Sequence, residues 1–233
     1  TSKFKGTITI PDIPIPSVNI EDETQYKLWK KTNVIPQKQK GFYAIGIKVH
    51  LGNFYTDKAH LLADLIKKYA NNELRLTLRQ NILIRHVKEG LVPFFYIELK
   101  KLGFTDIGYN GISDITSCPG TDTCNLGIAS STGITRELET MLKNEFPQLL
   151  ENKKITIKIS GCMNSCGQHS MASIGFQGMT VKSGQLVAPA LQVLLGGGVL
   201  GNGAGRIADK IIKIPSKRGP QALRAILIDF QSY

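Results

Sequence analysis

The chain has 233 residues, of which 42% are hydrophobic and 20% are charged, and its formal net charge is +11. This composition is typical of a protein with a buried core and excludes a disordered chain, while four cysteines are too few for a small disulfide-stapled secreted domain. The most apolar stretch, residues 188–205, is broken by Gln192 and by glycines before it could cross a bilayer. The sequence therefore predicts a cytoplasmic protein without a membrane segment.

The first residues contain neither a secretory leader nor an initiator methionine, so we expect them to come from the middle of a longer protein. Residues 1–40 carry prolines and a lysine-rich stretch with little periodicity, which predicts an extended connector. The positive charge favours an anionic partner, namely a nucleic acid, an acidic protein or a polycarboxylate ligand, although a basic surface can also serve solubility alone.

Residues 41–107 alternate between strand and helix patterns. The expected elements are a strand over 41–49, a helix capped by Thr56 or Asp57 and reaching Tyr69, strands over 74–78 and 82–87, and a helix over 92–102. This βαββα order resembles half of a ferredoxin-like fold.

Residues 108–233 predict an α/β layer. The expected elements are a helix capped by Thr132 or Thr135, strands over 154–160 and 171–176, a helix around Ala208 and a final helix over 221–230 that starts after Pro220. The glycine-rich loop at 196–205 is only a weak match to a phosphate-binding loop, because it lacks the required lysine and hydroxyl residue. We expect a tight connection here, in which the backbone or Arg206 approaches the buried interior.

The four cysteines form two short patterns, with five residues between Cys118 and Cys124 and three between Cys162 and Cys166. Structural zinc sites use knuckles of two to four intervening residues, so zinc fits only in part. Iron–sulfur clusters accept four thiolates at more varied spacings, and disulfides are the third alternative. Glycines beside the cysteines would let the backbone approach closely; they are Gly120, Gly127, Gly161 and Gly167.

The segment SGCMNSCGQHSMASIGF, with the cysteine pair upstream of it, resembles the signature of the siroheme-dependent nitrite and sulfite reductases. The run ELRLTLRQNILIRHV resembles the second T-x-x-Q-N segment of the same family. The resemblance implies that Cys118, Cys124, Cys162 and Cys166 hold a 4Fe-4S cluster and that the Cys166 thiolate also ligates the siroheme iron. It implies an α+β fold, with a ferredoxin-like half domain over 41–107 and a siroheme and 4Fe-4S domain over 108–233.

Two positions depart from the family pattern: Met163 replaces the usual proline, and Ser173 replaces an acidic residue. Asn164 and the GQH after Cys166 are more similar to the nitrite reductases, and His169 is expected either to orient this loop or to be structural.

The resemblance also implies that Arg79, Gln80 and Asn81 contact siroheme; the alternative is that they only form a polar turn. Arg75 and Arg85 are further candidates to clamp its carboxylates, or are simply solvated.

Members of the family contain two such halves, and this chain resembles the C-terminal one. The substrate-gripping residues are therefore expected in the absent N-terminal half, none of them in this chain, and the isolated half is expected to be inactive. The implied partners are that half, a small anionic substrate (nitrite or sulfite) and an acidic ferredoxin or flavodoxin as electron donor. The alternatives are a cofactor-free fragment of this fold and a zinc-stapled basic binding module, although nucleic acid is not the expected partner.

Overall fold

The computed structural model describes residues 14–200 and 202–232, which belong to two compact units, Thr1–Tyr109 and Asn110–Tyr233. Within the described ranges, no helix is both long enough and apolar enough to cross a membrane.

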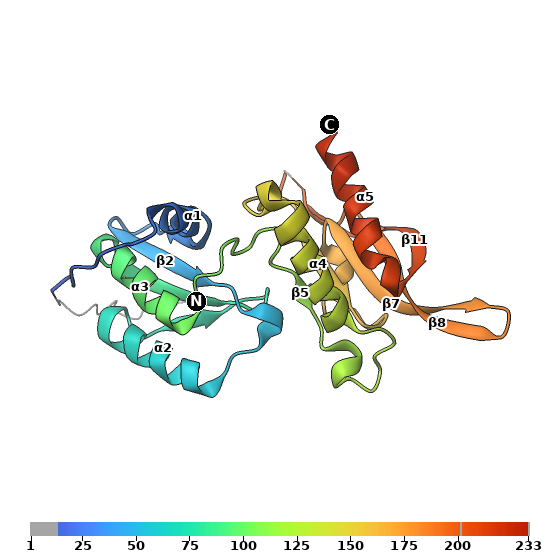
Figure 1. The fold of residues 1–233 in the computed structure, drawn as a ribbon, viewed down its shortest axis with the longest axis horizontal. Helices are drawn as coiled ribbons and strands as arrows, with labels where there is room; N and C mark the ends of the chain where they lie inside the picture. Colours follow the sequence, from blue (N-terminus) through green and yellow to red (C-terminus); the bar gives the residue numbers. More distant parts are fainter. Residues whose placement is uncertain (1–13, 201, 233) are drawn as a thin grey trace. The chain divides into compact units, whose positions relative to one another are not determined.

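In residues 14–109, unit 1 has an antiparallel four-stranded sheet with the strand order β1-β2-β4-β3, accompanied by three α-helices (Figure 1). Its elements are α1 (Glu23–Asn33), β1 (Val34–Pro36), β2 (Phe42–Ile47), α2 (Thr56–Tyr69), β3 (Leu74–Leu76), β4 (Ile82–Lys88) and α3 (Val92–Leu102). The segment from β2 to α3 has the βαββα order that the sequence predicts.

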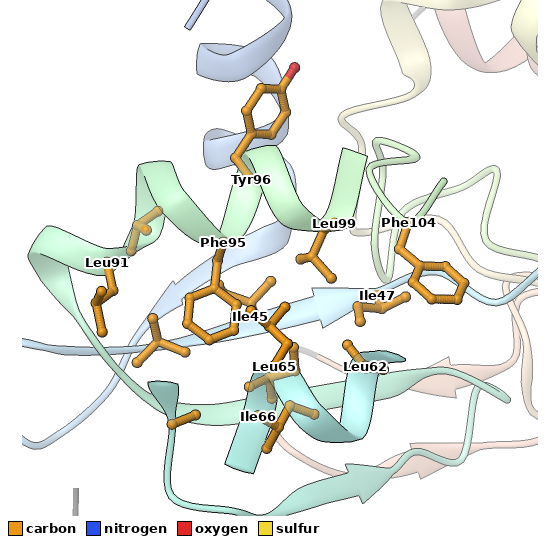
Figure 2. Close-up of a cluster of buried hydrophobic side chains, with 14 of the residues drawn as sticks. Ile45, Ile47, Leu62, Leu65, Ile66, Leu91, Phe95, Tyr96, Leu99 and Phe104 are labelled. Atoms are coloured by element: carbon orange, nitrogen blue, oxygen red, sulfur yellow. The ribbon is translucent and has the colours of Figure 1, made fainter. Parts of the chain in front are cut away.

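The core of unit 1 forms between the helices and the sheet. Phe95 of α3 and Leu62 of α2 gather beside Ile45 and Ile47 of β2, and all four side chains are fully buried (Figure 2). Burial of each such side chain contributes about 1.5–3 kcal/mol. Gly103 ends α3 in the left-handed conformation, with φ of 73°, a geometry that glycine adopts without steric cost.

Helix α1 contradicts the expected connector over residues 1–40. The Asp22 side chain caps the helix by accepting a hydrogen bond from the Gln25 N–H at 2.9 Å. Tyr26 and Trp29, one turn apart, are buried and stack on each other with ring centroids 6.2 Å apart. This part of the chain therefore belongs to the core of unit 1, whereas residues 1–13 of the expected connector lie outside the described residues.

Unit 2 is built on a five-stranded sheet with the order β11-β8-β7-β6-β5, in which β5, β6 and β7 are parallel and the other pairs antiparallel. Its elements are β5 (Thr116–Ser117), α4 (Ser131–Glu145), β6 (Ile157–Ser160), β7 (Ile174–Ser183), β8 (Leu186–Leu195), β9 (Gly198–Val199), β10 (Gly205–Arg206), β11 (Asp209–Pro215) and α5 (Gly219–Gln231). Helices α4 and α5 pack side by side, and their apolar residues share one core with the sheet (Figure 1).

Several predicted elements of unit 2 are present with altered limits. The alternating run at 154–160 becomes β6, and the last helix begins near Pro220 as expected. The helix expected around Ala208 is wrong, because the chain enters the edge strand β11 at Asp209. Strand β8 was not predicted. It overlaps the apolar stretch at residues 188–205, which was considered only as a possible membrane segment.

Two helix caps also differ from the prediction. Ser130, rather than Thr132 or Thr135, caps α4 by accepting a hydrogen bond from the Gly133 N–H at 3.2 Å. Tyr55 stands at the N-cap of α2, so Thr56 is its first helical residue.

Candidate cofactor-binding site

Parallel strands of unit 2 end side by side at the place where the cysteine loops begin. Ser117 of β5 stands opposite Ile159 of β6 in a parallel pair. Because the carboxyl ends of parallel strands meet at one edge of a sheet, the loops that follow them are neighbours. Cys118 follows β5 directly, and Cys162 comes one residue after Gly161, the first residue beyond β6.

The two cysteine loops are hydrogen-bonded to each other. The Gly161 N–H donates to the Cys118 Sγ at 3.1 Å, and the Cys118 N–H donates to the Ile159 carbonyl at 3.2 Å. The Gly161 carbonyl in turn accepts the N–H groups of Ile128 and Ala129 at 2.9 and 3.0 Å. The sequence-distant cysteine patterns therefore form one structural feature.

Glycines occupy the points where these loops approach most closely. A Cβ on Gly161 would lie 2.7 Å from the Gly120 Cα, and one on Gly127 would lie 2.8 Å from the Gly120 carbonyl carbon. A Cβ on Gly167 would collide with the carbonyl oxygen of Ile159. These contacts confirm that glycine allows the close backbone approach predicted beside the cysteines.

The loop between Cys118 and Cys124 is anchored to the start of α4. The Cys124 N–H donates to the Gly120 carbonyl at 3.0 Å. The Ser131 hydroxyl donates to the Cys118 carbonyl at 2.6 Å and lies 3.5 Å from the Cys118 Sγ. Ser131 was not among the predicted site residues; the adjacent Ser130, a favoured N-cap residue, was the available signal for this helix start.

The loop from Cys162 to Gln168 has a strained backbone. Ser165 and Gln168, on either side of Cys166, have φ angles of 60° and 58°. Left-handed residues other than glycine cost about 1–3 kcal/mol each and gather at functional sites. The turn is held by a 2.7 Å hydrogen bond from the Gln168 N–H to the Ser165 carbonyl and by the Lys158 ammonium, which donates to the Gln168 amide oxygen at 2.5 Å.

The four cysteines differ in exposure. Cys162 is buried, Cys118 and Cys124 are half-buried, and Cys166 is exposed, as are its neighbours Asn164 and Met163. All four are free thiols, so the disulfide alternative finds no support in the structure. Within the described ranges, no three histidine, cysteine, aspartate or glutamate side chains are already arranged to hold a metal ion. The donor set nevertheless fits a thiolate-bound iron–sulfur cluster, because four thiols share two adjoined loops and a backbone N–H points at one sulfur.

Two other residues of the family signature have structural partners. Ser173 exchanges hydrogen bonds with Thr156, accepting its N–H at 3.1 Å and donating its own N–H to the Thr156 hydroxyl at 3.0 Å. His169 is buried, and its burial lowers its pKa, an effect opposed by a hydrogen bond with Gln177 and reinforced by the charge of Lys210. The Ser173 hydrogen bonds therefore join the residues that directly precede β6 and β7, and His169 lies just after the cysteine loop.

In unit 1, residues 79–81 form the turn between β3 and β4. Asn81 is buried, and its amide oxygen accepts the Val49 N–H at 2.9 Å. This hydrogen bond favours a positioning role for Asn81 over the direct cofactor contact that the resemblance implies. Gln80 has a φ of 64°, and both Arg79 and Gln80 are half-buried.

A small cavity of about 320 Å³ adjoins this turn, with Gln80 and Asn81 in its wall. Leu76 lines it as well and is 81% exposed.

The other two arginines of this segment are paired with one carboxylate. Arg75 and Arg85 contact Glu73 at 2.5 and 2.8 Å, and the hydrogen bond from Arg85 is the main cause of the lowered pKa of Glu73. In the glycine-rich loop, Arg206 similarly pairs with Asp209 at 2.6 Å. Gly201 of that loop lies outside the described residues.

The two units together define a class of protein. A half ferredoxin-like unit comes first in the sequence, and it is followed by a mixed sheet that has four thiols in the loops at the carboxyl ends of its parallel strands. Residues 35–102 match the nitrite/sulfite reductase ferredoxin-like half domain, and residues 108–233 match the nitrite and sulphite reductase 4Fe-4S domain. The chain belongs to the nitrite and sulfite reductase family. The family and the α+β fold class predicted from the sequence are confirmed.

Relatives of both activities are similar to this chain. The ferredoxin–nitrite reductase of Synechococcus elongatus is 30% identical over 209 residues, which make up 86% of this chain and 39% of that protein. The ferredoxin sulfite reductase of Mycobacterium tuberculosis is 28% identical over 168 residues, 70% of this chain and 30% of that protein. The structure of the Mycobacterium tuberculosis NirA protein matches with a TM-score of 0.66 and 25% identity, over 82% of this chain and 36% of that chain. The chain therefore spans about two fifths or less of these proteins.

Proposed function

We propose that this chain is the cofactor-holding, C-terminal half of an assimilatory-type nitrite or sulfite reductase, which reduces nitrite to ammonia or sulfite to sulfide. The observation that carries the proposal is the 3.1 Å hydrogen bond from the Gly161 N–H to the Cys118 sulfur. It unites the two cysteine loops at one edge of the sheet and aims a backbone dipole at a ligand sulfur, a contact that tunes the potential of iron–sulfur clusters.

In this proposal, Cys118, Cys124 and Cys162 are ligands of a 4Fe-4S cluster, and Cys166 is a ligand of both the cluster and the siroheme iron. The exposure of Cys166 supports the shared role, because its sulfur must reach a group beyond its own loop. When bound, the two cofactors supply one-electron transfer and a haem iron on which the anion is reduced. Asn164, exposed in the same loop, is proposed to face the cofactor.

Arg79 and Gln80 are proposed to contact siroheme, and Asn81 to position them through its hydrogen bond to Val49. Guanidinium groups suit the carboxylates of siroheme because they form charge-assisted, often bidentate hydrogen bonds. Arg75 and Arg85 would contact siroheme only if each left Glu73 for a carboxylate of the cofactor. We therefore assign both arginines to their ion pairs with Glu73.

Residues that grip nitrite or sulfite are proposed to lie in the N-terminal half, outside this chain. The names of these relatives specify ferredoxin as their electron donor, and the charge of +11 of this chain suits an acidic ferredoxin or flavodoxin, since complementary charge raises association rates. Because the substrate-gripping residues are proposed to lie outside this chain, the isolated half should be inactive.

We favour nitrite as substrate because the segment from Asn164 to His169 is more similar to the nitrite reductases.

Metal analysis combined with an absorption spectrum tests this proposal on the complete enzyme that contains the chain. The expected result is about four non-haem iron atoms and labile sulfides per chain, with a haem-type Soret band. A colourless protein that contains zinc would favour the zinc-stapled module. A folded protein without metal would leave only a cofactor-free scaffold.

A further inference from the structure

Strand β6 has two polar side chains on the face of the sheet that lies away from the core of unit 2. Ile157 and Ile159 are buried in that core. Because successive side chains of a strand point to opposite faces, Lys158 and Ser160 share the other face. Lys158 is half-buried there, and Ser160 is buried. Some part of the chain must therefore cover this polar face of β6.

The backbone that follows Cys166 covers it. A Cβ on Gly167 would collide with the carbonyl oxygen of Ile159, and a Cβ on Gly175 of β7 would collide with the carbonyl oxygen of His169. Gly175 stands opposite Lys158 in the parallel pair of β6 and β7. The segment just after Cys166 thus lies directly on the strands, at the position of Lys158.

Both polar side chains of β6 bind this segment. The Ser160 Oγ accepts the Gly167 N–H at 3.1 Å, and the Lys158 ammonium donates to the Gln168 amide oxygen at 2.5 Å. The second hydrogen bond is charge-assisted, a kind that is roughly twice as strong as a bond between neutral groups. The two residues directly after Cys166 are therefore each anchored to β6.

The turn around Cys166 depends on such anchors because its backbone is strained. Ser165 and Gln168 both have a left-handed φ, a conformation that persists in residues other than glycine only when the surrounding structure enforces it. Lys158 binds the side chain of one of these two residues, whereas Ser160 binds only the backbone between them. Loss of the Lys158 contact would allow the turn to relax and the exposed Cys166 sulfur to change direction.

We propose that Lys158 is a positioning residue for Cys166: through Gln168 it holds the thiolate in the direction that a siroheme iron requires. This inference rests on the proposed function, because the direction of the sulfur matters for siroheme only if Cys166 is a shared ligand. Groups that hydrogen-bond behind a metal ligand orient it, and their loss typically lowers metal affinity by about 10–100-fold.

The variant Lys158→Met in the complete enzyme removes the ammonium and keeps most of the apolar side chain. We expect the Soret band of bound siroheme to decay about tenfold faster after dilution than in the wild type, and the spectroscopic coupling of haem and cluster to weaken. Lys158→Arg, which keeps a charged donor, should largely restore both. Lys154→Met is the matched control, because Lys154 is exposed and precedes β6; both quantities should equal those of the wild type.

Two changes at Gln168 separate the contact from the charge of the lysine. Gln168→Leu removes the acceptor and should match Lys158→Met, and the double variant should lose siroheme no faster than either single variant, since the two residues act as a pair. Gln168→Glu keeps an acceptor for the ammonium but offsets its charge, so it should retain siroheme as the wild type does. Gln168→Leu leaves β6 unchanged and still decides the question if Lys158→Met does not fold.

The inference is overturned if Lys158→Met and Gln168→Leu retain siroheme and its coupling to the cluster as the wild type does, even if urea unfolding shows that both are less stable. It is also overturned if Gln168→Glu behaves like Lys158→Met, because the charge and not the contact would then be responsible. A wild-type enzyme with neither cofactor would refute the proposed function and this inference together. A loaded wild type with indifferent variants would refute this inference alone.

Discussion

Gly161 makes two contributions to the cysteine site. Its N–H donates to the Cys118 sulfur, and its lack of a side chain lets the loop after β6 lie against Gly120 and Ala129. A methyl group here would meet backbone atoms on both sides, which cannot move as a flexible side chain would. The arrangement of the thiols thus depends on a residue that is not itself a ligand.

The Gly161→Ala variant should therefore lose both stability and cofactor. Overpacking against the backbone is expected to cost about 1–3 kcal/mol in the free energy of unfolding. Iron content should fall at the same time, because the added Cβ separates the two cysteine loops. Urea unfolding and iron analysis measure the two effects.

Gly205→Ala is the control for this change, because Gly205 has open space around its Cβ position and no positive φ. It should leave both quantities near the wild-type values. Equal iron content in Gly161→Ala and wild type would contradict the structural role assigned to Gly161.

Helix α1 shows how a packing contact can define an element that the local pattern does not. Trp29 contacts Tyr96 of α3 with ring centroids 5.0 Å apart, and both side chains are fully buried. Long-range aromatic contact of this kind stabilises the helix in its tertiary setting, whereas isolated helices of this length are marginal in water.

Replacing Trp29 by alanine should destabilise unit 1 by about 3–5 kcal/mol, the usual cost of deleting a fully buried aromatic side chain. The adjacent Lys30→Ala, at an exposed position of the same helix, should have little effect. Chemical denaturation of the two variants makes the comparison. Similar stabilities would show that residues 23–33 are a connector after all.

His86 makes strand β4 sensitive to pH. The residue is buried at a bulge of β4, with a φ of 60°, and its pKa is lowered by burial and by the charge of Arg85, against the opposing effect of Glu73. As the pH falls through 6.5, the ordinary pKa of histidine, this side chain therefore takes up a proton in the unfolded chain before it does so in the folded chain. The free energy of unfolding should decrease as the pH falls from this value towards the lower pKa of the folded state.

The variant His86→Asn should remove part of this pH dependence, because asparagine does not titrate and tolerates a positive φ. His169 shifts in the same direction, so some pH dependence should remain. Urea unfolding between about pH 7.5 and about pH 5 is the appropriate measurement. An unchanged pH dependence in the variant would show that His86 is not involved.

The elements that sequence reasoning predicted are those whose pattern is local. Residues 154–160 alternate in hydrophobicity and yield β6, and the Pro220 signal correctly starts α5. Helix α1 and strand β11 were missed because their environment defines them. Trp29 and Tyr26 look like isolated aromatics in a lysine-rich stretch, and β11 is an exposed edge strand whose isoleucines have no consistent buried face.

The same distinction applies to the site. Cysteine spacing and the neighbouring residues were sufficient to predict the family, which the comparisons confirm. The hydrogen bond from Gly161 to Cys118, the Ser131 contact and the pairing of Arg75 and Arg85 with Glu73 depend on atoms distant in sequence or on side-chain rotamers, so no pattern in the chain predicts them.

The chain as a whole is proposed to be the electron-carrying half of a longer reductase. It spans 39% of the Synechococcus elongatus relative, and the substrate-gripping residues are proposed to lie elsewhere. The central claim is that Cys166 links the cluster to siroheme.

The variant Cys166→Ser in the complete enzyme tests this claim most directly, with Met163→Ala as its control because Met163 is 77% exposed in the same loop. We expect Cys166→Ser to lose nitrite and sulfite reduction together with the spectroscopic coupling of haem and cluster, and Met163→Ala to retain both. Turnover by Cys166→Ser at the wild-type rate would contradict the assignment.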